Sequence, residues 1–269
     1  MRFYDAHNHL QDERFTNADD LMSVCRAEGV AKMVVNGACE TDWPAVATLA
    51  RQFPQVLPSF GYHPWYLHER TPDWIAELNM ALDSIPSAVG EIGLDRWKPG
   101  LDYAGQEDAF VAQLKIAAER GIPASIHCLQ AWGRLLDLLR VGPRPSCGFL
   151  LHSYGGSQEM IEPLATLGAY FSFPGYYANE RKAKQRETFK HVPLDRLLIE
   201  TDAPDQHLPD QLNRHPLVSS DGKPLNHPAN LRAVYEVVAG LRGMPIESLA
   251  MQVEENFRRL FGVVGGDPK

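Results

Sequence analysis

Short apolar runs alternate with amphipathic stretches along the chain. The apolar runs are rich in β-branched and aromatic residues, as buried strands are, and they cover residues 2–6, 32–37, 56–61, 88–95, 123–127, 148–152, 169–173 and 196–202. The stretches between them repeat apolar residues at helical spacing, which predicts helices over residues 18–28, 42–52, 71–83, 103–120, 132–140 and 157–167. This alternation is typical of a parallel sheet built from βα units.

Eight such strands favour a closed barrel, because parallel strands need cover on both faces and their crossovers are right-handed. The length of 269 residues fits this architecture, which typically takes about 250 residues. No repeat or linker divides the chain. We therefore predict an α/β protein with a single (β/α)8 TIM-barrel domain over residues 1–269, and further helices over residues 228–240 and 245–261 packed outside the barrel.

Polar residues follow the predicted strands at the point where each one ends. The first strand closes in His-x-His, and side chains two apart on a strand share a face, so His7 and His9 point into one cavity. The C-terminal ends of barrel strands all face one mouth. The other strand ends bring His63, Glu91, His127, His152 and Asp202 to the same mouth.

Four histidines and two carboxylates form a ligand set for a dinuclear metal centre: His7, His9, Glu91, His127, His152 and Asp202. Imidazole combined with carboxylate suits zinc and similar first-row divalent ions, so we expect two divalent ions per chain, zinc before manganese or magnesium. Burying Glu91 and Asp202 as anions without a partner is costly, and bound cations are an obvious partner.

Composition and charge limit the classes of partner that the protein can bind. A formal net charge of -8 argues against broad electrostatic capture of duplex nucleic acid. It does not exclude a phosphate substrate, because two bound cations reverse the local field. The four cysteines lack CxxC spacing and fit reduced thiols. With no bilayer-length apolar run and no signal-like N-terminal segment, we expect a cytoplasmic monomer that does not bind membranes.

The strand-end motifs resemble those of a known family. In order and spacing, the strings YDAHNHL, GYHPW, VGEIGLD, SIHC, LLHSYGGS, FSFPGYY and LLIETDAP are similar to the motifs of TatD-type metal-dependent hydrolases, the TatD-related deoxyribonuclease family of the amidohydrolase-like superfamily. The resemblance runs from residue 4 to about residue 261. It implies a metallo-dependent hydrolase barrel with two divalent ions that hydrolyses DNA phosphodiester bonds.

Residue by residue, the resemblance implies one ion held by His7, His9, Glu91 and Asp202 and a second held by Glu91, His127 and His152. It also implies that His63 contacts the substrate phosphate. Glu91 and Asp202 are then the catalytic residues. Two ions bridged by Glu91 share and activate a water as hydroxide, and Asp202 takes its proton and passes it to the leaving oxygen.

The chain departs from the family pattern near the substrate. Relatives of the deoxyribonuclease kind carry an arginine shortly after the fifth-strand histidine, whereas this chain has none until Arg134. A family carboxylate is replaced by His227, which we expect to be a packing residue of a loop. Asp95 is expected either to orient a ligand imidazole or to cap a loop. Substrate contacts are assigned to His63, Trp132, Arg134 and Tyr176.

Three functions remain open at this point. The leading one is cleavage of phosphodiester bonds at exposed ends of single-stranded DNA. The alternative is a deacylase or amidohydrolase acting on aminoacyl-tRNA or on a small metabolite ester or amide, because the same hydroxide attacks a carbonyl carbon. The third is a metal-stabilised interaction protein without turnover, against which the complete ligand set argues.

Overall fold

A parallel barrel forms the centre of the molecule. The computed structural model describes residues 1–265. Its sheet runs in chain order through β1 (Phe3–Asn8), β2 (Val30–Asn36), β3 (Val56–Phe60), β4 (Ala88–Asp95), β5 (Ala124–Leu129), β6 (Phe149–Leu151), β7 (Ala169–Pro174) and β8 (Leu197–Glu200). All seven successive pairs in this order are parallel. The predicted (β/α)8 barrel is confirmed.

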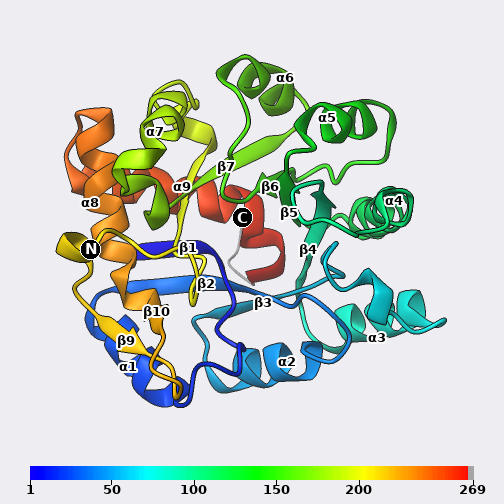
Figure 1. Cartoon of the computed structure of the whole chain (residues 1–269), viewed down its shortest axis with the longest axis horizontal. Coiled ribbons are helices and arrows are strands. Elements are labelled where there is room, and N and C mark those ends of the chain that lie inside the picture. Colours follow the sequence, from blue (N-terminus) through cyan, green and yellow to red (C-terminus); the bar gives the residue numbers. More distant parts are fainter. Residues whose placement is uncertain (266–269) are drawn as a thin grey trace.

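Helices surround the strands, as Figure 1 shows. They are α1 (Ala18–Ala27), α2 (Trp43–Gln52), α3 (Trp74–Ser84), α4 (Tyr103–Arg120), α5 (Trp132–Val141), α6 (Ile161–Thr166), α7 (Ala183–Phe189), α8 (Leu231–Arg242) and α9 (Ile246–Gly265). Helices α1 to α7 lie between strands in the sequence, and α8 and α9 follow the last strand. Their apolar residues join the core of the barrel, so the outer face of the parallel sheet is covered. No helix in residues 1–265 is both long and apolar enough to cross a bilayer.

The barrel closes between its first and last strands at the mouth. The backbone N–H of Asp202 donates to the carbonyl of His7 at 2.9 Å, and the N–H of His9 donates to the carbonyl of Ala203 at 2.7 Å. The buried carboxylate of Asp5 adds a side-chain link, because it accepts from the backbone N–H and the hydroxyl of Thr201 at 3.0 and 2.6 Å. The closure therefore fixes both ends of the predicted ligand set relative to each other.

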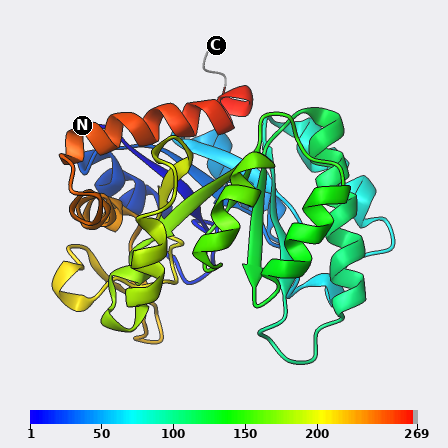
Figure 2. The ribbon, with the colours of Figure 1, turned by 90° about the horizontal axis from the view of Figure 1, so that it is seen from above.

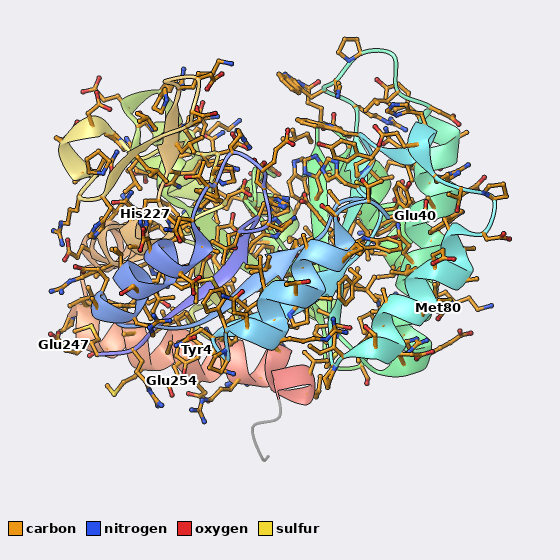
Figure 3. All side chains as sticks on the ribbon, turned by 90° about the horizontal axis from the view of Figure 1, so that it is seen from below. Tyr4, Glu40, Met80, His227, Glu247 and Glu254 are labelled. Atoms are coloured by element: carbon orange, nitrogen blue, oxygen red, sulfur yellow. The ribbon has the colours of Figure 1, made fainter. Side chains whose placement is uncertain are left out.

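The opposite end of the barrel is covered by α9, which Figure 2 shows lying across it. The Tyr4 ring packs on Phe257 with ring centroids 5.0 Å apart, and the Tyr235 hydroxyl bonds to both the N–H and the carbonyl of Tyr4 at 3.0 Å. Arg2 forms an ion pair with Glu254, which lies close to Tyr4 in Figure 3. The two predicted C-terminal helices thus lie outside the barrel, as expected.

Three local differences from the sequence expectations have physical reasons. The predicted helix over residues 157–167 is a 3₁₀ turn, Gln158–Met160, followed by the short α6, because Pro163 cannot donate a backbone hydrogen bond and its ring excludes a regular preceding turn. The eighth strand stops at Glu200, since Asp202 takes a left-handed φ of 51°. An antiparallel hairpin of β9 (Pro216–Val218) and β10 (Pro224–Asn226) was not predicted, because its strands are too short to show a period.

Candidate metal centre

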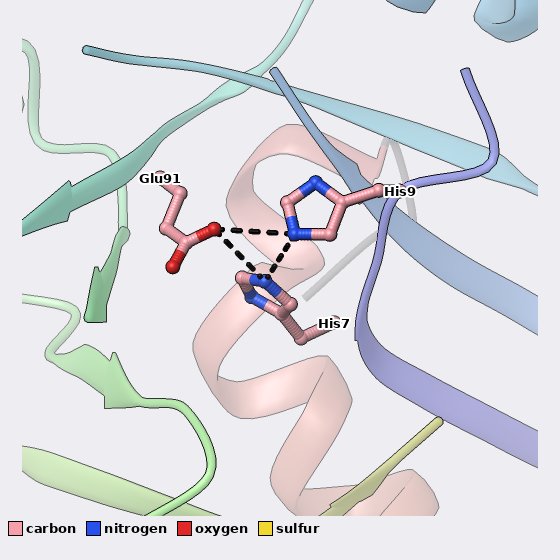
Figure 4. A group of neighbouring side chains, drawn as sticks. All are labelled: His7, His9 and Glu91. Carbon is pink, nitrogen blue, oxygen red and sulfur yellow. Dashed lines mark hydrogen bonds and ion pairs between the residues drawn. The ribbon is translucent and has the colours of Figure 1, made fainter. Parts of the chain in front are cut away.

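Glu91 lies at the centre of the predicted cluster. Its Oε2 is 3.4 Å from Nε2 of His7 and 3.2 Å from Nε2 of His9, the group drawn in Figure 4. Its Oε1 is 2.7 Å from Nε2 of His152 and 3.1 Å from Nδ1 of His127. The side chains come from β4, from the ends of β1 and β5, and from the residue after β6, so strands far apart in sequence supply one cluster.

The remaining predicted members lie on either side of this carboxylate. Asp202 Oδ1 is 3.7 Å from Nε2 of His7 and 3.6 Å from Nε2 of His9. Nε2 of His63 is 3.3 Å from Oε1 of Glu91. The structure thus brings all seven predicted strand-end residues together, in overlapping groups whose ligand atoms lie within 4.8 Å of one another.

Hydrogen bonds on the outer side of three rings, those of His7, His9 and His127, fix which nitrogen faces the cluster. Nδ1 of His152 is buried without a hydrogen-bond partner among the described residues. Nδ1 of His9 is 2.8 Å from the carbonyl of Asn36, which can only accept, so Nδ1 carries a proton and Nε2 points inward. Nε2 of His127 donates to Oδ2 of Asp95 at 3.0 Å, which leaves its Nδ1 facing Glu91. Nδ1 of His7 pairs with the Ser125 hydroxyl at 2.9 Å. Such outer partners are the usual support of metal-binding imidazoles.

His63 differs from His9 and His127 in which ring nitrogen carries the proton. Its Nδ1 accepts the backbone N–H of Trp65 at 3.1 Å, so the neutral ring carries its proton on Nε2, the atom that faces Glu91. Burial lowers the pKa of His63 to about 4, which keeps the ring neutral near pH 7. His63 therefore presents a hydrogen-bond donor to the centre of the site, whereas a metal ligand would present a lone pair.

The electrostatics of the cluster favour cations. Burial lowers the pKa of His7 to about 4. Burial also opposes charge on His9, but the carboxylates of Glu91 and Asp202 outweigh it and raise the pKa to about 10. Burial would raise the pKa of Glu91, yet the surrounding imidazoles hold it well below its ordinary value. Glu91 thus stays anionic and draws positive charge into the mouth.

The donor set fits divalent ions. Imidazole nitrogens and carboxylate oxygens converge from several strands, and their outer atoms are held by Ser125, Asn36 and Asp95. Asp95 itself is held in turn, because the indole of Trp65 donates to its Oδ2 at 2.7 Å. Burial alone would raise the pKa of Asp95, but the hydrogen bond from His127 and the backbone N–H of Lys98 lower it. Asp95 is thus an orienting partner of His127, one of the two roles expected from the sequence.

A polar network behind the cluster was missed by the sequence analysis. Glu200 is fully buried and accepts from the backbone N–H and hydroxyl of Ser153 at 2.7 and 2.6 Å, and from the Ser172 hydroxyl. Burial raises its pKa to about 7. Gln206 donates to the Ser153 hydroxyl at 2.6 Å and to Asp202 Oδ2 at 2.7 Å. An acid ending an otherwise apolar strand was the available signal for Glu200; Gln206 carried none.

The cluster opens into a cavity of about 260 Å³. Beside the cluster, its wall includes two tryptophans, the last two residues of β5 and side chains that follow β6 and β8: Trp65, Trp97, Cys128, Leu129, Ser153, Asp205 and Gln206. No lysine or arginine of residues 1–265 belongs to this lining. The cavity wall therefore combines aromatic, apolar and polar side chains with one acid, Asp205, beside the carboxylates of the cluster.

The structure places only one of the four predicted substrate contacts at the cavity. His63 lines the cavity, whereas Trp132, Arg134 and Tyr176 do not. Trp132 packs edge-on against Tyr154 with ring centroids 4.7 Å apart. The guanidinium of Arg134 donates two hydrogen bonds, of 2.9 and 2.6 Å, to the carboxylate of Glu107. Tyr176 lines a neighbouring cavity of about 920 Å³, which shares Gln206 with the first.

Fold and site together define a class of protein, the metal-dependent hydrolases whose ligands come from the strand ends of a (β/α)8 barrel. Residues 4–262 match the family model described as TatD related DNase, and the chain belongs to this family. The TatD-type hydrolase expected from the strand-end motifs is thereby confirmed.

Relatives cover almost the whole chain. The 3'-5' ssDNA/RNA exonuclease TatD of Escherichia fergusonii is 31% identical over 267 residues, covering 97% of this chain and 99% of the relative. YabD of Bacillus subtilis, described as an uncharacterized metal-dependent hydrolase, is 30% identical with the same coverage of both chains. The crystal structure of YJJV, a TatD homologue from Escherichia coli, has a TM-score of 0.87 at 26% identity, covering 97% of this chain and 98% of that one.

Proposed function

We propose that this protein uses two divalent ions to hydrolyse phosphodiester bonds at exposed ends of single-stranded nucleic acid. Single-stranded DNA is the leading substrate. The observation that carries the proposal is the Glu91 carboxylate, which faces two groups of inward-pointing imidazoles at once. A relative described as a 3'-5' ssDNA/RNA exonuclease, matched over nearly its full length, supports the substrate class.

The ligand sets follow from the two oxygens of Glu91. His7 and His9 face its Oε2 and, with Asp202 beside them, would hold the first ion; His127 and His152 face its Oε1 and would hold the second. Two bound divalent ions supply Lewis acidity and water activation in such a site. Zinc as the resident metal, a monomeric state and a cytoplasmic location stay predictions.

Two side chains handle protons and charge. Gln206 holds Oδ2 of Asp202, which directs its Oδ1 at the cluster, where it would take a proton from water and return it to the leaving oxygen. His63 offers its Nε2 proton to a non-bridging phosphate oxygen, which stabilises the charge that develops there. This role agrees with the substrate contact expected for His63.

The charges around the mouth favour one path for the rest of the nucleic-acid substrate. A cavity of about 700 Å³ on one side is lined by many carboxylates, namely Asp12, Glu13, Asp42, Glu69 and Asp205, and its Arg14 is already paired with two of them. On the other side, Arg181 and Lys182 lie over the Tyr176 ring at 5.1 and 4.8 Å, with fewer acids nearby. A polyanion therefore leaves the site past Tyr176.

The testing experiment is hydrolysis of short single-stranded DNA by protein loaded with zinc, manganese or magnesium, beside Asp202→Asn. We expect a metal-dependent product ladder that is at least about 100-fold weaker for Asp202→Asn, since a positioned base typically contributes about 10²- to 10⁴-fold. Equal ladders from both proteins would remove Asp202 from the mechanism. The same preparations report the metal count, which should fall in Glu91→Ala.

One observation favours the second candidate, an ester or amide hydrolase. The cavity lining lacks lysine and arginine among the described residues, and Arg134 is occupied by Glu107, so no guanidinium stands ready to clamp a phosphate. A neutral acyl substrate would need none. Protein that holds two ions, leaves DNA intact and hydrolyses aminoacyl or simple aryl esters would favour this candidate.

A further inference from the structure

Trp97 stands out among the cavity residues. It is 58% exposed, although indole rings are usually largely buried, and it lines the same cavity as Glu91 and Asp202. It lies in the turn that follows β4, two residues after Asp95. A large apolar ring is thus held in water at the edge of the reaction centre, and no part of the mechanism proposed above uses it.

The ring is held in a defined place. Trp97 stacks on Trp65 with ring centroids 6.5 Å apart and an interplanar angle of 29°. The Asp95 carboxylate fixes both residues, because it accepts the Trp65 indole N–H at 2.7 Å and the backbone N–H of Trp97 at 2.7 Å. The same carboxylate orients His127. The position of the tryptophan pair is therefore tied to that of the metal cluster.

Trp65 links the pair to the reacting centre. Its ring lies edge-on to His63 at 5.3 Å and to His127 at 6.3 Å. The ammonium of Lys98 sits 4.5 Å from the Trp65 ring centroid, a cation–π contact that holds a positive charge beside the pair. Although Trp65 packs against it, Trp97 stays 58% exposed, so part of its ring is open to a further stacking partner.

We propose that Trp97, supported by Trp65, is a stacking platform for the nucleobase next to the bond that is cut, with Lys98 placed beside the strand's phosphate. This rests on the proposed function and adds a base-binding subsite to it. Every nucleobase has a π face, so stacking on an exposed indole binds bases without selecting a sequence. The platform also supplies affinity that the cavity lining, which has no lysine or arginine among residues 1–265, does not.

The test compares two short single strands that differ only at the end that is cut, one with a normal terminal nucleoside and one with an abasic terminal residue. Binding is measured by fluorescence anisotropy with the label at the far end, in metal-loaded protein carrying Asp202→Asn to prevent turnover. We expect Trp97→Ala to weaken binding of the normal strand about 10-fold and to leave binding of the abasic strand unchanged. Trp97→Phe, which keeps an aromatic face, should lose much less.

The matched control is Tyr103→Ala, another exposed aromatic that does not line the cavity. Equal losses for both strands, or the same loss in Tyr103→Ala, would overturn the platform. Turnover gives an independent readout, since Trp97→Ala should raise KM for the normal strand and change kcat little. If wild-type protein cuts no single strand at all, the proposed function fails, whereas cleavage without a base effect rejects only the platform.

Discussion

The side-chain amide of Gln206 donates a hydrogen bond of 2.7 Å to Oδ2 of Asp202, while Oδ1 of the same carboxylate faces His7 and His9. Both residues take a left-handed φ of 51°, a conformation that side chains other than glycine rarely adopt. Such backbone strain persists where the surrounding structure enforces it, as it does in many active sites. The turn after β8 therefore holds the acid in one orientation.

Gln206→Ala should lower kcat about 10-fold or more and change KM little, because Asp202 loses the donor on Oδ2 that fixes the orientation of its carboxylate. The measurement is steady-state hydrolysis of single-stranded DNA by metal-loaded protein. Gln211→Ala, an exposed glutamine of the same loop, is the matched control and should keep the wild-type kcat. A wild-type kcat in Gln206→Ala would show that Asp202 needs no support.

Asp95→Ala should weaken metal binding about 10- to 100-fold, the usual effect of removing the outer partner of a ligand imidazole. The measurement is competition with a chelator of known affinity, read as metal retained per chain. Asp108→Ala removes an exposed carboxylate nearby on α4 and serves as the control. Unchanged retention in Asp95→Ala would mean that His127 orients without it.

Glu200→Ala should destabilise the fold by about 2 to 4 kcal/mol, because it leaves the buried donors of Ser153 and Ser172 without an acceptor. Denaturant unfolding of metal-free proteins measures this without a contribution from bound ions. Glu187→Ala, an exposed acid on α7, should cost less than about 0.5 kcal/mol. If Glu200→Ala lost no more unfolding free energy than Glu187→Ala, a structural role of the network would be contradicted.

His227 predicts a pH dependence of stability. Burial lowers its pKa to about 4, and its Nδ1 accepts the backbone N–H of Ala229 at 3.0 Å, which a proton there would prevent. The unfolded chain binds the proton near pH 6.5 and the folded one only near pH 4, so stability is full above pH 6.5 and falls between 6.5 and 4.

We expect His227 to contribute about 1 to 3 kcal/mol to that fall. His227→Asn keeps a capping acceptor but does not titrate, so its free energy of unfolding should depend less on pH over this interval. His68→Asn, at an exposed position, is the matched control. Identical pH curves for wild type and His227→Asn would remove His227 as the source.

Much of the fold could be predicted because each strand is an apolar run and each carries its polar residue at the same end. His7 and His9 illustrate this: their spacing of two placed both rings in one cavity, where their Nε2 atoms lie 3.3 Å apart. The order of the strands followed from the alternation with helices. These features depend on local sequence and on the geometry of parallel sheets.

The outer part of the site could not be predicted, since it depends on how loops turn back over the mouth. Trp132 and Arg134 follow a ligand closely in sequence, yet α5 carries them away to Tyr154 and Glu107. Gln206 is four residues beyond Asp202 and returns to it only through left-handed turns. Adjacency in sequence was a poor guide wherever the chain leaves the sheet.

The contact between Tyr4 and Tyr235 can form only late in the synthesis of the chain. These residues are separated by 231 positions, and their hydrogen bonds hold the strand that carries His7. During translation β1 therefore emerges well before α8, and it makes these contacts only after Tyr235 has left the ribosome. Contacts at such separation form late and slow folding. The strand that carries His7 is accordingly fixed at its other end only after α8 has been made.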